Sequence, residues 1–318
     1  MWWFKKKEPA VCEAIGFIYE YARKSKRGIA YSRNYRNLAR HLNLYSEARG
    51  IKVYSNNYTY EVAEDYVDHL RELGLMKNTI KTIIGKTAYM FRKMGRNGYE
   101  VNYSFEDVRP DKEKAQMVYL TTKEIHSLHK LPIRDRNIRI IRDVFVIGCL
   151  TGMRYGDYSC LSSSNLQNGR IVRKTQKTGE VVEIPTHWII KETIGSYSGF
   201  PKYESSSQNF NKVIKGLCKK IGATEEILWE RTVGKKVVRK RIKKYKMVSS
   251  HTARRSFATN AYLAGIPTAR IMLLTGHKTE QAFFSYIRIQ KAENASILSE
   301  HPFFKGETER KGASESES

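Results

Sequence analysis

Residues 250–288 read SHTARRSFATNAYLAGIPTARIMLLTGHKTEQAFFSYIR, and this stretch carries the most informative pattern in the chain. Polar groups recur inside its helical apolar pattern: His251, Arg254, His277 in a Thr-Gly-His turn, and Tyr286. Positions i and i+3 of a helix share a face, so His251 and Arg254 can point together at an anion. An HxxR pair alone is a weak signal in so basic a chain. The ordered series is more specific and predicts a phosphate site.

A second arginine follows the apolar segment VFVIGCLTGMRYGDYSCL at 144–161. Arg154 stands just after Gly152, which predicts the end of a buried helix. An arginine in such a place is more often a surface cap than a catalytic group. Asp157 lies three residues further on, where its carboxylate can orient neighbouring basic groups.

From Gly169 the hydrophobic period changes from helical to alternating. GRIVRK at 169–174 and VVEIP at 181–185 predict two short strands, with Gly179 supplying the turn. Lys174 and Lys177 are the two candidates for a functional lysine near this turn. The sequence pattern by itself leaves both open.

HTARRSFATN, LLTGHK, the tyrosine of SYIR and the segment around Arg154 together resemble the tyrosine recombinases, the phage-integrase family. The resemblance runs from about Leu120 to Phe304. It favours Lys177 over Lys174, because Lys177 immediately precedes the Thr-Gly turn. It also favours Arg254 over its neighbour Arg255, and Tyr286 over rivals such as Tyr262.

The resemblance implies a role for each matched residue. By this resemblance, Arg154 and Arg254 clamp the phosphate, and Asp157 supports them. His277 donates to a non-bridging oxygen, and His251 assists proton movement. Tyr286 attacks the phosphate, and Lys177 protonates the leaving 5′-oxygen. The implied product is a 3′-phosphotyrosyl link.

The expected fold is mainly α with a small antiparallel β-sheet. Helical patterns at 13–24, 33–49, 59–73 and 78–95 predict a four-helix N-terminal unit, which resembles the SAM-like core-binding domain of the same family. The expected divisions are 1–106 for this DNA-binding domain, 107–119 for a charged linker, 120–305 for an α+β catalytic domain and 306–318 for a disordered tail. A short amphipathic helix after Tyr286 packs either on its own domain or on a neighbouring protomer.

The charge balance predicts a polyanionic partner. The chain has 57 Lys and Arg against 32 Asp and Glu, a net charge of +25, and such a field attracts nucleic acid. Two helix faces and the basic segment 231–246, expected to form a β-hairpin, are the candidate contact surfaces. The candidate DNA-binding residues are Arg33, Arg36, Arg40, Lys77, Lys81, Lys86, Arg92, Arg239 and Arg241.

Several other classes of function are disfavoured by the sequence. No P-loop and no acidic cluster for Mg²⁺ occurs, so we expect no cofactor. His126 and His129 form an HxxH pair without further ligands nearby, and the four cysteines show no CxxC, so we expect no metal. No run approaches a membrane span, and no signal peptide is evident, so a cytoplasmic, nucleoid-associated protein is expected.

The predicted function is therefore site-specific recombination of double-stranded DNA. Exchange between two duplexes needs four active sites, which implies a tetramer on DNA formed from monomers, and the resemblance leaves room for an accessory DNA-bending protein. Two alternatives remain: a type IB topoisomerase, which also joins DNA to a tyrosine, and a non-catalytic DNA-binding regulator. The target sequence, and the choice among integration, excision, inversion and resolution, are not encoded in these motifs.

Overall fold

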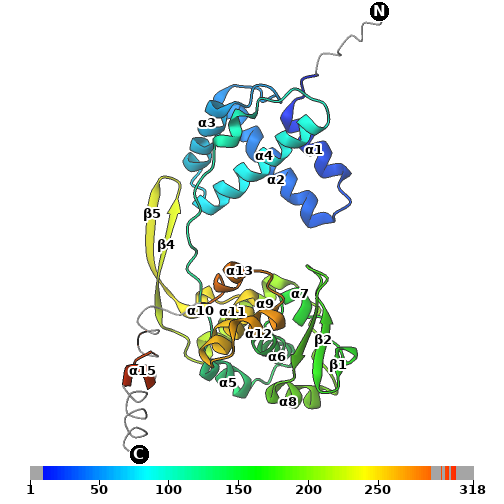
Figure 1. Ribbon diagram of the computed structural model, residues 1–318, viewed down its shortest axis with the longest axis vertical. Coiled ribbons are helices and arrows are strands. Elements are labelled where there is room, and N and C mark those ends of the chain that lie inside the picture. Colours follow the sequence, from blue (N-terminus) through cyan, green and yellow to red (C-terminus); the bar gives the residue numbers. More distant parts are fainter. Residues whose placement is uncertain (1–9, 288–294, 296–297, 301, 306–318) are drawn as a thin grey trace, which may run out of the picture. The chain divides into compact units, whose positions relative to one another are not determined.

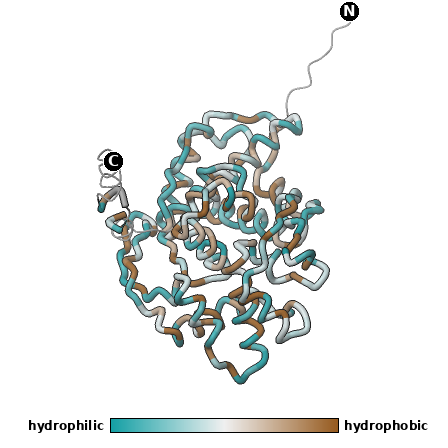
Figure 2. Tube along the Cα trace, turned by 60° about the horizontal axis from the view of Figure 1, so that its bottom comes forward, coloured by the Kyte–Doolittle hydropathy of each residue, from teal (hydrophilic) through white to brown (hydrophobic). Residues whose placement is uncertain are grey.

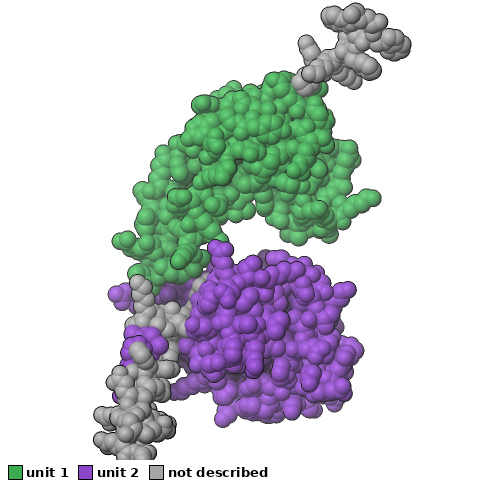
Figure 3. Space-filling model, in the orientation of Figure 1, with its two compact units in different colours: residues 1–116, 228–240 green, residues 117–227, 241–318 purple. Residues whose placement is uncertain are grey.

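The computed structural model describes residues 10–287, 295, 298–300 and 302–305. They form two compact units, each considered by itself (Figures 1 and 3). Unit 1 contains residues 1–116 and 228–240, and unit 2 contains residues 117–227 and 241–318. The expectation of a mainly helical chain with small antiparallel sheets is confirmed.

Unit 1 is a helical domain with an aromatic core. Its helices are α1 (Ala14–Lys24), α2 (Ile29–Arg49), α3 (Tyr60–Glu72) and α4 (Lys77–Arg96), followed by the short helix η1 (Tyr103–Asp107). Their apolar faces meet in one buried cluster, in which the Tyr58 and Phe91 rings stack with centroids 4.3 Å apart. Figure 2 shows hydrophobic and hydrophilic residues interspersed along the trace, as expected where helices bury one face.

Two helix starts in unit 1 differ from the sequence prediction. Helix α2 begins at Ile29, one turn earlier than expected, with Gly28 at φ 90° before its first turn. The Ser32 hydroxyl lies within the helix and donates to the Ala22 carbonyl of α1. Helix α4 begins at Lys77. The side chain of Asn78 donates from Nδ2 to the Glu113 carbonyl and accepts the Glu113 amide at Oδ1. Asn78 therefore holds the segment that contains Glu113 against α4.

Unit 1 also contains most of a hairpin, residues 228–240, that is distant in the sequence. Strands β4 (Glu226–Val233) and β5 (Lys236–Lys243) form the hairpin expected at 231–246, although it starts at Glu226. Its turn meets the corner between α3 and α4, where the Gly234 amide donates to the Leu75 carbonyl at 2.9 Å. Side chains of Glu113 and Gln116 accept from the β4 amides of Thr232 and Glu230.

Unit 2 is built around a central helix with a small sheet at one side (Figure 1). Its elements before the hairpin are α5 (Thr122–Lys130), α6 (Arg136–Thr151), α7 (Tyr155–Tyr158), η2 (Ser163–Asn165), β1 (Leu166–Gln167), β2 (Arg170–Lys174), β3 (Val181–Pro185), α8 (Trp188–Tyr197) and α9 (Ser207–Lys220). After the hairpin come α10 (Lys244–Met247), α11 (Ser250–Leu263), α12 (Thr268–Thr275), α13 (Glu280–Phe284) and α15 (Pro302–Lys305). Helix α6 is buried along nearly all of its second half, as its apolar run predicts.

The three-stranded sheet has the order β1-β2-β3 and is antiparallel throughout. Ile171 on β2 faces Ile184 on β3, and both side chains are buried. The turn between β2 and β3 closes as predicted with Gly179 at φ 71°. The helix expected after Tyr286 and the tail at 306–318 lie largely outside the described residues.

The hairpin turn leaves no room for a side chain at Gly234, which gives a test of its docking. A Cβ there would lie 2.6 Å from the Arg71 carbonyl oxygen, and the backbone has φ +59°. Gly74 has a similar φ of +69° but open space around it. We expect Gly74→Ala to cost about 1–2 kcal/mol from backbone strain, and Gly234→Ala to cost roughly 1–3 kcal/mol more from the clash.

Urea unfolding followed by circular dichroism measures both costs. Equal losses in the two variants would show that the turn does not pack against α3 as described.

Candidate active site

The centre of the site is the guanidinium of Arg254, which is 2% exposed on α11. Its Nη1 donates to the Gly152 carbonyl at 2.9 Å, and its Nη2 lies 2.9 Å from His277 Nε2. Arg255 instead donates to the Val118 carbonyl and the Thr252 hydroxyl, so it ties the start of unit 2 to α11. The structure thus places Arg254, and not Arg255, at the polar cluster.

The end of α6 brings Arg154 to the same place. Gly152 caps α6 in the left-handed conformation at φ 66°, and a Cβ there would lie 2.4 Å from the Phe257 ring of α11. This close approach allows the Gly152 carbonyl to accept from Arg254. Arg154 follows as the residue before α7, and the Tyr158 hydroxyl of α7 donates to the Ser250 carbonyl at the start of α11.

Two donors of this arginine pair lack a partner. Arg154 Nη1 and Arg254 Nε are buried without a hydrogen bond in the described part of the chain. Burial, followed by the neighbouring charge of Arg154, lowers the pKa of Arg254 to about 10. Buried guanidinium donors that point to no acceptor are costly. The arrangement therefore favours a bound anion that would satisfy both side chains.

Asp157 connects this pair to the β2–β3 turn. Its side chain is buried and its Oδ1 accepts the Gln176 amide at 2.9 Å, next to Lys177. Sequence reasoning expected Asp157 to orient basic side chains, and the hydrogen bond found for it here is to the backbone of the lysine turn. Its carboxylate is also close enough to raise the pKa of Arg254, against the larger lowering effects.

The lysine candidates differ in their surroundings. Both Lys174 and Lys177 are exposed, Lys174 on the last position of β2 and Lys177 in the turn itself. Burial and then the charges of Arg255, Arg254, Arg154 and Lys177 lower the pKa of His251 in the first turn of α11. Lys177 is thus electrostatically near His251, which also senses the charges of Arg254 and Arg154.

His277 and Tyr286 complete the cluster from the last described elements. His277 follows Gly276, which ends α12 at φ 65°, and its Nδ1 lies 2.7 Å from the Thr275 hydroxyl. The Tyr286 ring is 4.9 Å from the His277 ring, centroid to centroid, and 5.3 Å from the Arg254 guanidinium carbon. The rival Tyr262 is 37% exposed and contacts Phe284.

Sequence reasoning missed Thr275 and the Gly152 carbonyl as parts of the site. Thr275 was visible in the LLTGH motif, but nothing in a linear pattern shows that a hydroxyl reaches the histidine ring. The Gly152 carbonyl is a backbone group, and only the tertiary packing of α6 against α11 presents it to Arg254.

The candidate DNA-binding residues fall into two groups. Arg33, Arg36 and Arg40 are exposed along one side of α2, and no ion pair is found for them in the described part of the chain. Most of the others already have acidic or carbonyl partners: Lys77 with Asp111, Lys81 with the Pro110 carbonyl, Arg92 with Glu106, Arg239 with Glu230 and Arg241 with Glu226. Lys86 is half-buried. Within the predicted set, the α2 arginines are therefore the exposed residues most available to contact DNA.

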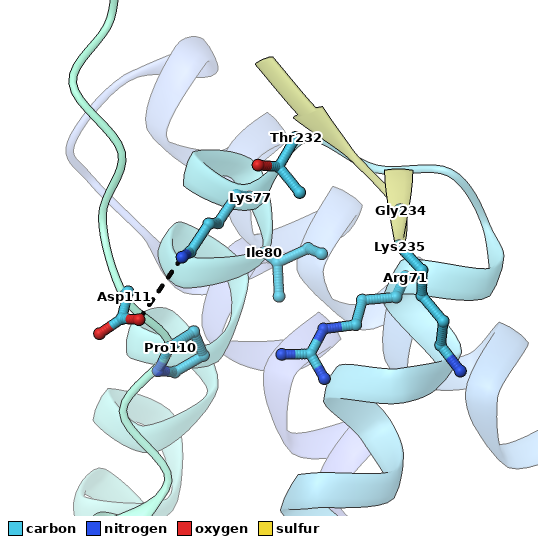
Figure 4. A pocket seen from close by; sticks show the side chains of 8 residues that line it. All are labelled: Arg71, Lys77, Ile80, Pro110, Asp111, Thr232, Gly234 and Lys235. Atoms are coloured by element: carbon cyan, nitrogen blue, oxygen red, sulfur yellow. Dashed lines mark hydrogen bonds and ion pairs between the residues drawn. The ribbon is translucent and has the colours of Figure 1, made fainter. Parts of the chain in front are cut away.

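A polar pocket of about 350 Å³ lies in unit 1 where the hairpin turn meets α3 and α4 (Figure 4). Arg71, Lys77 and Lys235 contribute cationic side chains to it, and Asp111 pairs with Lys77 at 3.4 Å. Lys77 is the only residue of the predicted set in its lining. The pocket contains none of the residues that gather around Arg254.

The described residues offer no obvious metal site. They contain no group of three or more His, Cys, Asp or Glu side chains able to hold an ion. His129 of the HxxH pair packs its ring against Trp188 and faces Glu192 at 3.4 Å. No helix among the described residues has the length and apolar character needed to cross a membrane.

Comparisons with known proteins agree with this architecture. Residues 14–111 match the phage integrase SAM-like domain. The fold is similar to a lambda integrase fragment solved as a dimer bound to a COC′ core site, with a TM-score of 0.63 and 18% identity over 87% of this chain and 95% of that one. It is also similar to Tn1549 transposon integrase in complex with circular intermediate DNA, with a TM-score of 0.60 and 14% identity over 91% of this chain and 100% of that one.

A lambda integrase tetramer bound to a Holliday junction also matches, with a TM-score of 0.60 and 18% identity over 83% of this chain and 77% of that one. No curated protein sequence matches the chain. The resemblance to tyrosine recombinases indicated by the motifs is confirmed at the level of the fold and of the N-terminal domain.

The surroundings of His277 predict an unusual titration. Burial and then the charges of Arg254 and Arg154 lower its pKa to about 4 from 6.5, so the ring is neutral at pH 7. We expect the NMR signals of His277 to titrate near pH 4. Between pH 6.5 and 4 the unfolded chain binds a proton that the folded chain excludes, so this residue's contribution to stability falls as the pH drops through that window.

His277→Gln provides the control, because other histidines also titrate. The wild type should lose stability relative to this variant as the pH falls. A midpoint at or above 6.5 would contradict the described environment.

Proposed function

We propose that this protein is a site-specific DNA recombinase that cuts and rejoins DNA strands through a 3′-phosphotyrosyl intermediate. The observation that carries the proposal is the position of the Tyr286 ring, which lies against both the Arg254 guanidinium and the His277 imidazole. A phenol held beside the Arg254 guanidinium, which keeps one donor without a protein acceptor in the described chain, is positioned to attack a phosphodiester. The integrase fold supports the same conclusion.

The two arginines would stabilise the transition state. A phosphodiester under attack gathers negative charge on its non-bridging oxygens, and guanidiniums donate charge-assisted hydrogen bonds to such oxygens without losing their protons. Arg154 Nη1 and Arg254 Nε are buried donors with no protein acceptor in the described chain. A bound phosphate would supply the acceptor that both lack.

The remaining groups would move protons. The Tyr286 oxygen forms a bond to phosphorus as the bond to the 5′-oxygen breaks. The tyrosine proton leaves toward the His251 side of the cluster, and Lys177 protonates the departing 5′-oxygen. A bound phosphate would also offset the charges of the two arginines beside His277, which favours protonation of the ring. The protonated ring would donate from Nε2 to a non-bridging oxygen, and this contact would replace the one that Nε2 makes with Arg254 in the structure without DNA. The phosphotyrosyl bond retains the energy of the broken ester, so religation needs no ATP.

Double-stranded DNA is the proposed substrate and partner. Exchange between two duplexes requires four active sites, so we infer a tetramer on DNA formed from monomers, with an accessory DNA-bending protein as an optional component. The lambda integrase tetramer bound to a Holliday junction has a similar fold. A nucleoid-associated location in the cytoplasm follows from this substrate.

A covalent adduct tests the chemistry directly. A duplex selected from a random pool by binding to the protein is nicked beside the scissile position, so that the released strand diffuses away and the adduct accumulates. We expect an SDS-resistant protein–DNA band in the wild type and in Tyr262→Phe, because Tyr262 lies outside the cluster. The band should disappear in Tyr286→Phe.

An adduct that survives Tyr286→Phe would contradict the proposed nucleophile. Absence of any adduct in the wild type would favour the DNA-binding regulator. Relaxation of supercoiled DNA without strand exchange between paired sites would favour the topoisomerase.

The α2 arginines provide a test of DNA binding. Each neutralised phosphate contributes a slope of about 0.9 to the fall of log affinity with log salt. We expect the triple change of Arg33, Arg36 and Arg40 to Gln to reduce that slope by roughly 2–3 in a fluorescence anisotropy titration. Arg23→Gln is the control, because Arg23 is paired with Glu20 at 2.8 Å.

An unchanged salt slope in the triple variant would remove α2 from the DNA interface.

A further inference from the structure

Two contacts at opposite ends of the His277 ring specify where its proton sits. Nε2 lies 2.9 Å from Arg254 Nη2, and Nδ1 lies 2.7 Å from the Thr275 hydroxyl oxygen. Arginine is only a donor, so Nε2 must present a lone pair to it. The first contact alone therefore excludes a proton on Nε2 in this arrangement.

The second contact gives the same answer independently. The Thr275 hydroxyl lies 2.7 Å from the Ile271 carbonyl oxygen, a separation that requires a hydrogen between the two oxygens. The hydroxyl proton is thus directed to the Ile271 carbonyl, and the hydroxyl oxygen accepts from His277. Nδ1 must then carry the ring proton. Both ends of the ring specify the neutral Nδ1–H tautomer.

We propose that Thr275 is a positioning residue: its hydroxyl fixes the Nδ1–H tautomer of His277 and, through that ring, the orientation of the Arg254 guanidinium. The chain of hydrogen bonds runs from Arg254 Nη2 through the ring and the hydroxyl to the Ile271 carbonyl, while Arg254 Nη1 is held by the Gly152 carbonyl. The guanidinium is therefore fixed at two points, one at the C-terminal cap of α6 and one just after α12. The effect of Thr275 on DNA cleavage rests on the proposed function, whereas the assignment of the His277 tautomer does not.

The surroundings of Thr275 fit this role. It is 1% exposed in the last turn of α12, and the ring follows it directly through Gly276. The contacts found for its hydroxyl in the described chain are the Ile271 and Met272 carbonyls and His277 Nδ1, so it acts on the site through His277. Polar groups that orient a functional imidazole in this way fix both the ring plane and the tautomer. Thr275→Val keeps the branched shape but removes the acceptor, and Thr275→Ser keeps the acceptor.

The tautomer is measurable without DNA. In protein labelled with ¹⁵N-histidine, two-bond ¹⁵N–¹H correlations at neutral pH distinguish the two neutral tautomers, and the His277→Gln spectrum assigns the signal. We expect Nδ1–H in the wild type and in Thr275→Ser. In Thr275→Val we expect a mixture or Nε2–H, because a buried Nδ1–H left without an acceptor is costly and the ring, no longer held by the hydroxyl, turns away from Arg254. An Nε2–H wild type, or an unchanged tautomer in Thr275→Val, would overturn the assignment.

Cleavage kinetics test the positioning role. Under single turnover on the nicked duplex, Thr275→Val should slow adduct formation about fivefold to tenfold, the effect expected for one lost hydrogen bond, with DNA affinity unchanged. Thr275→Ser should restore the rate. Normal cleavage in Thr275→Val despite a changed tautomer would overturn the positioning role.

The two proposals can fail separately. If the wild type forms no adduct at all, the proposed function fails, and the NMR experiment still decides whether Thr275 fixes the tautomer.

Discussion

The structure of the site depends on one buried charge, the Arg254 guanidinium. A cation removed from water is costly unless it is paired. Here the hydrogen-bonding partners of Arg254 are neutral, the Gly152 carbonyl and the His277 ring, and a second guanidinium lies nearby. The neighbouring carboxylate, Asp157, is already bonded to the Gln176 amide. The site thus keeps an excess of positive charge that a phosphate would balance.

The surrounding fold explains how this charge is held in place. Gly152 lets α6 approach α11 closely, which brings its carbonyl to Arg254. Helix α7 follows immediately and carries Arg154 at its start and Asp157 within it. Asp157 in turn fixes the base of the turn that carries Lys177. One short segment, residues 152–157, therefore connects the two arginines with the lysine turn.

Much of this arrangement could be predicted from the sequence. Apolar periodicity gave α6, α9 and the core of unit 1, and the spaced polar series gave Arg154, Arg254, His277 and Tyr286, which the structure brings close together. What the sequence could not show were contacts between distant segments. The partner of Asp157, the Thr275 relay and the attachment of the hairpin turn to α3 and α4 all depend on tertiary packing.

The α4 lysines illustrate the same limit. A basic helix face predicts a polyanion contact, but the sequence does not reveal that Lys77 and Lys81 are engaged by the segment at 110–111. The α2 arginines, with an identical sequence signal, remain exposed. Which basic face is available is decided by the fold and not by composition.

The central claim is that one particular tyrosine, held over the buried guanidinium, becomes bonded to DNA. Mass spectrometry of the trapped adduct after nuclease and trypsin digestion tests it most directly. Cleavage after Lys278 and Arg288 releases TEQAFFSYIR, in which Tyr286 is the only tyrosine. The account predicts a nucleotide attached to this peptide. A nucleotide on the peptide 256–270, which contains Tyr262, or on any other tyrosine would contradict it.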